Sequence, residues 1–105
     1  MMFKHHPLPR EGRALEADSD HLLARTSAGA LLLIHIPPGA YALEQHAMPE
    51  YIVCLHGLLQ MEAADGERCS AAVGEMIEVP PGLSHRFAND CDAVVMTVAQ
   101  RAPVV

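Results

Sequence analysis

The chain has 105 residues and a formal net charge of −6 with histidine neutral. This length fits one domain, large enough to bury a real core without disulfide bonds. An acidic chain repels the phosphate backbone, which makes nucleic acid a poor partner. No apolar run approaches the roughly 18 residues of a membrane-spanning helix, and the first residues lack the apolar segment of a signal peptide. We therefore expect a cytoplasmic protein with no membrane partner.

Half of the residues are hydrophobic, but there is no Trp and there are only two Tyr and two Phe, so the core must be aliphatic. The three cysteines are Cys54, Cys69 and Cys91. Their number is odd and no pair has Cys-x-x-Cys spacing, which argues against a disulfide framework. Cys54 lies in an apolar run and is expected to be a buried small hydrophobe.

Residues 1–20 are polar and contain Pro7, Pro9 and Gly12. This composition predicts an extended N-terminal arm or an edge strand, with a short helical turn around Arg13–Ala17. The globular part is expected to occupy residues 21–105.

From residue 21 onward, apolar runs of four to eight residues recur between turn signals rich in Gly and Pro. Many short strands at regular spacing predict an all-β sandwich or barrel. The expected strands are Leu22–Thr26, Ala30–Ile36, Tyr51–His56, Leu58–Ala63, Cys69–Val73, Glu75–Val79, His85–Ala88 and Asp92–Ala99.

Several residues predict how these strands are connected. Asp65-Gly66 is a hairpin signal between two of them. The pairs Pro37-Pro38 and Pro80-Pro81 cannot donate hydrogen bonds to a sheet, so each must end or begin a strand. Gly57 is expected to allow a tight turn into the run that starts at residue 58.

Four side chains of metal-ligand type lie close to these turns. Glu44 and His46 are two residues apart, so on a strand they point to the same face. Glu50 follows at the start of the next expected strand, and His85 begins a strand just after a Pro-Gly turn. A slip of one residue would present Gln45 in place of Glu44 and His46, and both registers stay open.

The residues around His85 follow a longer pattern. Gly74, Pro80, Gly82, His85 and Asn89 have the spacing Gly, five residues, Pro-x-Gly, two residues, His, three residues, Asn. With this pattern the sequence resembles the cupin superfamily, and in particular its small single-domain RmlC-like members. The resemblance spans about residues 20–100.

The first motif of that family is present in part. His46, three residues, Glu50, six residues and Gly57 match its second half. Glu44 stands where the family has its first histidine, and the spacer from Gly39 is one residue short.

The resemblance implies an antiparallel β-barrel of the jelly-roll type, a double-stranded β-helix with its ligands facing inward. It implies that His46, Glu50 and His85 bind a divalent transition metal, Fe, Mn, Zn or Ni, with Glu44 in the remaining position. Imidazoles and carboxylates are suitable ligands for such ions. It also implies a homodimer.

Several functions remain open at this point. The first is a metal-dependent oxygenase or isomerase acting on a small polar molecule, with Glu44 as fourth ligand or general base. The second is a non-catalytic sensor that binds a metal or small ligand, and the third is a metal-free barrel that holds an apolar ligand. His35 and His56 are expected to be structural or pocket-lining, and Arg25 and Arg86 to lie at the surface.

Overall fold

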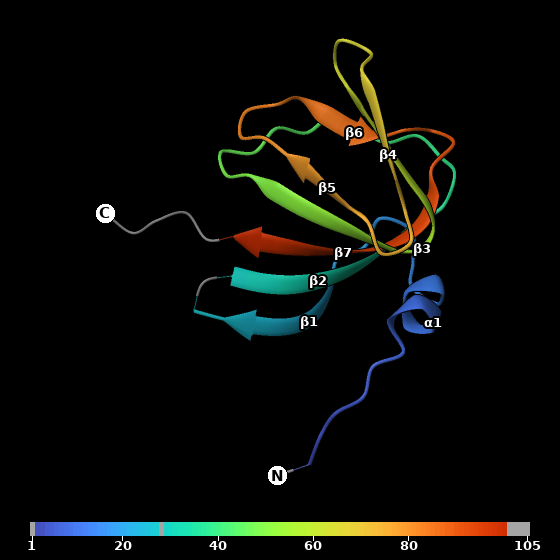
Figure 1. Ribbon diagram of the computed structural model, residues 1–105, viewed down its shortest axis with the longest axis vertical. Coiled ribbons are helices and arrows are strands. Elements are labelled where there is room, and N and C mark those ends of the chain that lie inside the picture. The colour runs from blue at the N-terminus through green and yellow to red at the C-terminus, as the bar shows by residue number, and fades with distance from the viewer. Residues whose placement is uncertain (1, 28, 101–105) are drawn as a thin grey trace.

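The computed structural model describes residues 2–27 and 29–100, in which one short helix precedes antiparallel strands (Figure 1). The elements are α1 (Leu8–Arg13), β1 (His21–Thr26), β2 (Gly29–Ile36), β3 (Glu50–Ala63), β4 (Arg68–Ala72), β5 (Met76–Val79), β6 (His85–Phe87) and β7 (Asp92–Gln100). The expected antiparallel β fold is confirmed. Ala28 and residues 101–105 of the expected globular part lie outside the described residues. The one helix found in the described ranges is too short to cross a membrane.

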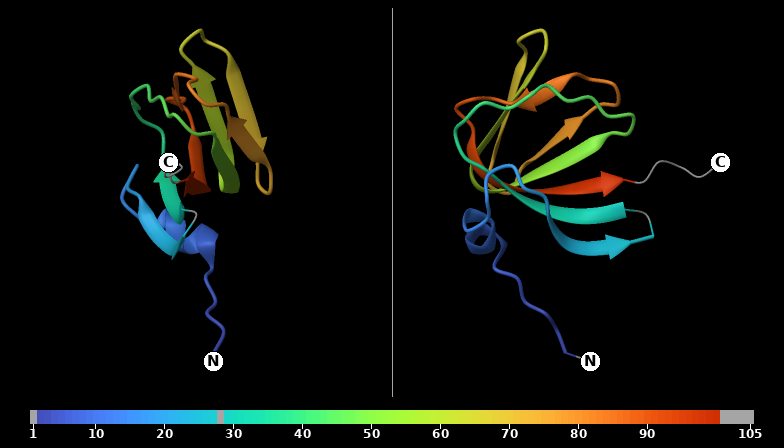
Figure 2. Two further views of the ribbon diagram at one scale, coloured as in Figure 1. Left: turned by 90° about the vertical axis from the view of Figure 1, so that its left-hand side faces the viewer. Right: turned by 180° about the vertical axis from the view of Figure 1, so that it is seen from behind.

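The strands form one sheet in the order β1-β2-β7-β3-β4, and β5 and β6 also pair with β3. β3 has 14 residues, so its first half pairs with β5 while its second half pairs with β4 and β6. The sheet bends so that β1, β2 and β7 face β4, β5 and β6 (Figure 2). The described strand path is open, since β1 and β4 at its two ends each pair with a single strand.

The expected turn at Gly57 is wrong, because the two strands predicted on either side of it are one continuous strand, β3. Gly57 has φ +74° and pairs with Ala93 of β7. The register between β3 and β7 shifts between Cys54 and His56. The glycine therefore lies in an irregular stretch of a strand that continues, because both flanking apolar runs find partners in the same sheet.

The expected edge strand within residues 1–20 is also wrong. Residues 2–7, before α1, have no helix or strand, as the alternative of an arm predicts, and an isolated bridge joins Ala17 to His35. α1 ends at Arg13, where the expected helical turn begins. Pro9 lies in the first turn of α1, where backbone N–H groups have no partner within the helix, so proline costs no hydrogen bond there. α1 packs through Gly12, which is buried against Val94 of β7.

Gly12→Ala should destabilise the protein. An added Cβ would overlap Cγ1 of Val94, a fully buried and stiff side chain that has no free space to turn into. Overpacking of this kind costs about 1–3 kcal/mol, which exceeds the helix propensity that alanine adds. Urea denaturation should show the loss in Gly12→Ala and not in Arg13→Ala, an exposed position on the same helix. Equal stability of both variants would contradict this packing of α1.

The core is aliphatic, as expected. Its largest fully buried side chains are Leu33, Ile36, Ile52, Leu59, Val94 and Val95, with Cys54 and Cys91 beside them. β2, β3 and β7 supply most of these residues, which places the core against the centre of the sheet.

Cys54, Cys69 and Cys91 are free in the structure, and Cys54 is buried as expected. Cys54 and Cys91 are buried, whereas Cys69 is exposed on β4, and burial raises the pKa of the Cys91 thiol. Because the thiolate is the reactive form, iodoacetamide should modify Cys69 alone in the folded protein. Peptide mass spectrometry with and without denaturant measures this, and fast labelling of Cys54 or Cys91 in the folded chain would contradict it.

Candidate metal site

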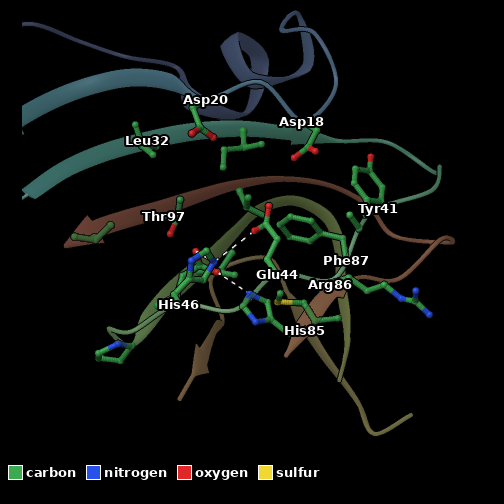
Figure 3. Close-up of a pocket in the computed structure, with 18 of the residues that line it drawn as sticks. Asp18, Asp20, Leu32, Tyr41, Glu44, His46, His85, Arg86, Phe87 and Thr97 are labelled. Carbon is green, nitrogen blue, oxygen red and sulfur yellow. Dashed lines mark ion pairs between the residues drawn. The ribbon is translucent and has the colours of Figure 1, made fainter. Parts of the chain in front are cut away.

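The structure brings the four predicted site residues to one pocket (Figure 3). Glu44 and His46 lie in the segment between β2 and β3, Glu50 is the first residue of β3, and His85 is the first residue of β6. Two backbone hydrogen bonds join the segments: Glu44 N donates to His85 O at 2.7 Å, and His85 N donates to Glu44 O at 3.0 Å. Residues far apart in the sequence are thereby fixed side by side.

The turn around Gly82 fixes the register of this segment. Gly82 N donates to His46 O at 2.8 Å, and the Gln45 side-chain amide donates to Gly82 O at 2.6 Å. Gln45 therefore bonds to the turn, while Glu44 and His46 face the pocket. Of the two registers left open by the sequence, the structure has the one that presents Glu44.

The donor atoms of the four side chains face one another. Nε2 of His46 lies 3.4 Å from Glu44 Oε2 and 3.7 Å from Glu50 Oε2. Nε2 of His85 lies 3.5 Å from Glu50 Oε1, so the two oxygens of Glu50 face different imidazoles. One donor atom from each of Glu44, His46 and His85 also lies within 4.8 Å of the others, a group that could hold a metal ion.

Hydrogen bonding leaves both histidines ready to act as ligands. Nδ1 of His85 lies 2.8 Å from the carbonyl of Leu83, which can only accept, so Nδ1 carries the proton and Nε2 has a free lone pair. Nε2 of His46 is buried and has no hydrogen-bond partner among the described residues. An ionised carboxylate also only accepts, so a cation among these imidazole nitrogens and carboxylate oxygens would give each of them a partner.

The spacing of these atoms suits a metal ion. Nitrogen and oxygen ligands bind first-row ions at about 2.0–2.2 Å, so two neighbouring ligand atoms on one ion lie about 3.0–3.5 Å apart. The measured 3.4, 3.5 and 3.7 Å are close to this range and are long for direct hydrogen bonds. The residues present therefore fit a divalent ion.

Exposure differs across the site. The His85 side chain is 6% exposed and that of Glu50 26%, whereas Glu44 is 63% exposed. His85 and Glu50 form the closed side, and Glu44 lies on the side that is open to solvent. A molecule entering the pocket would meet Glu44 before it met His85.

The pocket has a volume of about 380 Å³ and extends well beyond these four residues. Its other polar lining includes Asp18 and Asp20, before β1, and Thr97 of β7. Sequence reasoning missed all three, because no local pattern shows that residues 18–20 and β7 face the histidines. Only their acidic or hydroxyl character could have drawn attention to them.

The other histidines and arginines singled out in the sequence lie outside this site or face away from it. His35 is structural, with Nδ1 3.1 Å from the carbonyl of Leu15, and His56 is exposed. Neither lines the pocket. Arg25 is exposed, and Arg86 pairs with Glu62.

Comparisons with known proteins agree with this architecture. A family profile described as a cupin domain matches residues 32–99. A crystal structure of a Neisseria meningitidis protein is similar with a TM-score of 0.76 at 20% identity, over 93% of this chain and 100% of that one. A cupin-2 domain containing protein from Shewanella frigidimarina has a TM-score of 0.76 at 20% identity, over 88% of this chain and 89% of its own. An RmlC-like cupin with a double-stranded β-helix fold from Methanocaldococcus jannaschii has a TM-score of 0.68 at 15% identity, over 84% of each chain. No curated protein matches the sequence.

Proposed function

Because this chain belongs to the cupin family, we propose that it is a small metal-binding cupin whose double-stranded β-helix holds one divalent transition-metal ion. His46, Glu50 and His85 are the proposed ligands, with Glu44 beside them. The observation that carries the proposal is the buried Nε2 of His46, which has no hydrogen-bond partner among the described residues and faces carboxylate oxygens at 3.4 and 3.7 Å.

The ligand set suits Fe, Mn, Zn or Ni, and two histidines with one carboxylate and open positions are typical of non-heme iron sites. When bound, such an ion supplies a Lewis acid or an oxygen-binding centre. Holding the ion and meeting the substrate are the roles of the chain's own residues. Glu50 and the two histidines fix the ion, while the exposed Glu44 faces the pocket as fourth ligand or as general base.

The pocket beside the ion is proposed to take a small polar molecule, as in a metal-dependent oxygenase or isomerase. A non-catalytic binder or sensor is the second candidate. It is favoured by one observation: among the described residues that line the pocket, no histidine or cysteine lies outside the proposed ligand set.

Calorimetric titration of chelator-treated protein with Mn²⁺, Fe²⁺, Zn²⁺ and Ni²⁺ tests the metal site. We expect one ion per chain for at least one of them. Binding should also raise the melting temperature, because a ligand at about a hundred times its Kd stabilises the folded state by about 2.7 kcal/mol. If none of the four ions binds stoichiometrically, the proposed function is wrong.

Oxygen consumption and NMR analysis of products, measured with the metal-loaded protein and a panel of diketones, phenols and thiols, separate the two candidates, since an isomerase would consume no oxygen. Turnover of any of these compounds supports an enzyme. Binding of a compound without turnover supports the binder or sensor.

We further propose that the protein acts in the cytoplasm and that it is a homodimer, the second of which the family resemblance implies. Light scattering after size-exclusion chromatography measures the mass in solution. A monomer at all concentrations would contradict the dimer and leave the metal site unaffected.

A further inference from the structure

The wall of the pocket opposite His85 is acidic. Asp18 and Asp20 lie there, across the pocket from the histidine (Figure 3). Neither has a cationic partner within ion-pair distance among the described residues, where the ion pairs use other carboxylates. The charge of this wall is therefore not neutralised by the protein.

The basic side chain that lines the pocket does not change this balance. Nε of Arg86 donates to Glu62 Oε1 at 2.7 Å, and the side chain points away from the histidines (Figure 3). With Glu44 and Glu50 on the metal side and two aspartates on the other, the pocket presents four carboxylates, of which a bound divalent ion would balance the charge of the first two only. An arrangement of this kind attracts cations and repels anions.

The backbone holds Asp18 in place. Its N–H donates to the carbonyl of His35 at 2.9 Å, next to the bridge between Ala17 and His35. It has φ 55°, a conformation that aspartate tolerates better than most residues. Burial, Glu44 and Asp20 together raise the pKa of the Asp18 carboxyl, as expected for like charges that share a cavity.

A second, independent feature points to a ligand in the same cavity. Thr97 is 5% exposed, and its Oγ1 is buried without a hydrogen-bond partner among the described residues. It lines the pocket from β7, with its hydroxyl directed toward His46 (Figure 3). A buried hydroxyl without a partner is destabilising, and a polar group of a ligand would recover that loss.

Apolar side chains complete the walls. Leu32, Ile34 and Val95 lie on the β2 and β7 side, and Tyr41 and Phe87 meet edge to face with ring centroids 5.7 Å apart. Asp18 and Asp20 themselves are exposed to solvent, so their attraction for a cation is partly screened.

We propose that the pocket binds a small organic cation whose positive group lies against Asp18 and Asp20 and whose polar end reaches the Thr97 hydroxyl beside the metal site. This rests on the proposed function, because it names the class of molecule that enters the pocket next to the ion. A protonated amine that also carries a hydroxyl is the simplest molecule of this class.

Three probes of similar size test the charge preference: aminopropanol, propanediol and hydroxypropanoate, each with its two polar groups at opposite ends of a three-carbon chain. Their Kd values are measured by amide chemical-shift titration of the zinc-loaded protein. We expect aminopropanol to bind about tenfold tighter than propanediol, and hydroxypropanoate to bind most weakly. No binding of aminopropanol, equal affinities, or preference for the anion would overturn the proposal.

Variants test which residues cause the preference for aminopropanol. The double variant Asp18→Asn with Asp20→Asn should abolish the preference for aminopropanol, whereas Glu78→Gln, which removes an exposed carboxylate on β5, should keep it. Thr97→Val is nearly isosteric. It should weaken the binding of aminopropanol and of propanediol about tenfold without lowering the melting temperature. If the double variant keeps the wild-type order, the aspartates do not select the ligand.

The zinc affinity, measured by calorimetry on the same samples, separates this inference from the proposed function. Zinc binding without a preference for the amine refutes the cation pocket alone. If the protein binds no zinc and the same titration of the metal-free protein still shows a preference for the amine, the metal site is refuted and the cation pocket stands.

Discussion

Replacing His85 with alanine is expected to weaken Zn²⁺ or Mn²⁺ binding by about 100-fold or more, since even loss of a group that only orients a ligand costs 10–100-fold. His85 is the least exposed of the four proposed ligands, and its proton on Nδ1 leaves Nε2 free to bind. His46→Ala should act in the same direction. Calorimetric titration of chelator-treated protein measures the effect.

His56→Ala is the matched control. His56 is exposed on β3 and lies outside the pocket, so its loss should leave the metal affinity unchanged. His85→Gln keeps most of the side-chain volume and guards against a folding defect, which circular dichroism would reveal. Wild-type affinity in a folded His85 variant would remove His85 from the ligand set.

The two carboxylates should differ in the same experiment. Glu50 has one oxygen 3.7 Å from His46 and the other 3.5 Å from His85 and is 26% exposed, whereas Glu44 lies 3.4 Å from His46, within 4.8 Å of a His85 nitrogen, and is 63% exposed. We therefore expect Glu50→Gln to weaken metal binding more than Glu44→Gln does. The reverse order would make Glu44 the principal carboxylate ligand.

Gly57→Ala is expected to lower the free energy of unfolding by about 3 kcal/mol. At φ +74° an L residue is strained, and the added Cβ would overlap the backbone carbonyl oxygen of Asp92. Asp92 is paired with Leu58 in the β3–β7 ladder, so moving its backbone would disturb that pairing. Urea denaturation at equilibrium measures the loss.

Gly66→Ala separates the cost of the positive φ from the cost of the close contact with Asp92. Gly66 has φ +92° in the β3–β4 turn, and nothing lies within 4 Å of an added Cβ. This variant should therefore show the conformational cost alone, about 1–2 kcal/mol. If Gly57→Ala costs no more than Gly66→Ala, the close approach of Asp92 does not matter for stability.

Most strands and their turns could be predicted from the sequence because their causes are local. Asp65-Gly66 makes the β3–β4 turn, where Gly66 N donates to Ala63 O at 2.9 Å and has the positive φ that glycine allows. Pro80-Pro81 ends β5, and the turn that follows leads directly into His85. Because the motif around His85 consists of residues close together in the chain, it predicts that this histidine begins a strand.

The features that could not be predicted depend on distant partners. From local sequence Gly57 is typical of a turn, and only the pairing of β7 with the residues before and after it shows that the strand continues. α1 has only six residues, too few for a helical period, and packs because Gly12 meets Val94. Asp18 and Thr97 have no local signal at all, since only the bend of the sheet brings them to the pocket.

The position of β7 determines when this molecule can fold. β7 is the last strand of the described chain, yet it lies between β2 and β3 and joins them. During synthesis, the edges of β2 and β3 that pair with β7 stay unpaired until residues 92–100 leave the ribosome. Such edges promote association between nascent chains. We therefore expect the sheet to assemble after translation of β7, with the β3–β4 hairpin as the earliest structure to form.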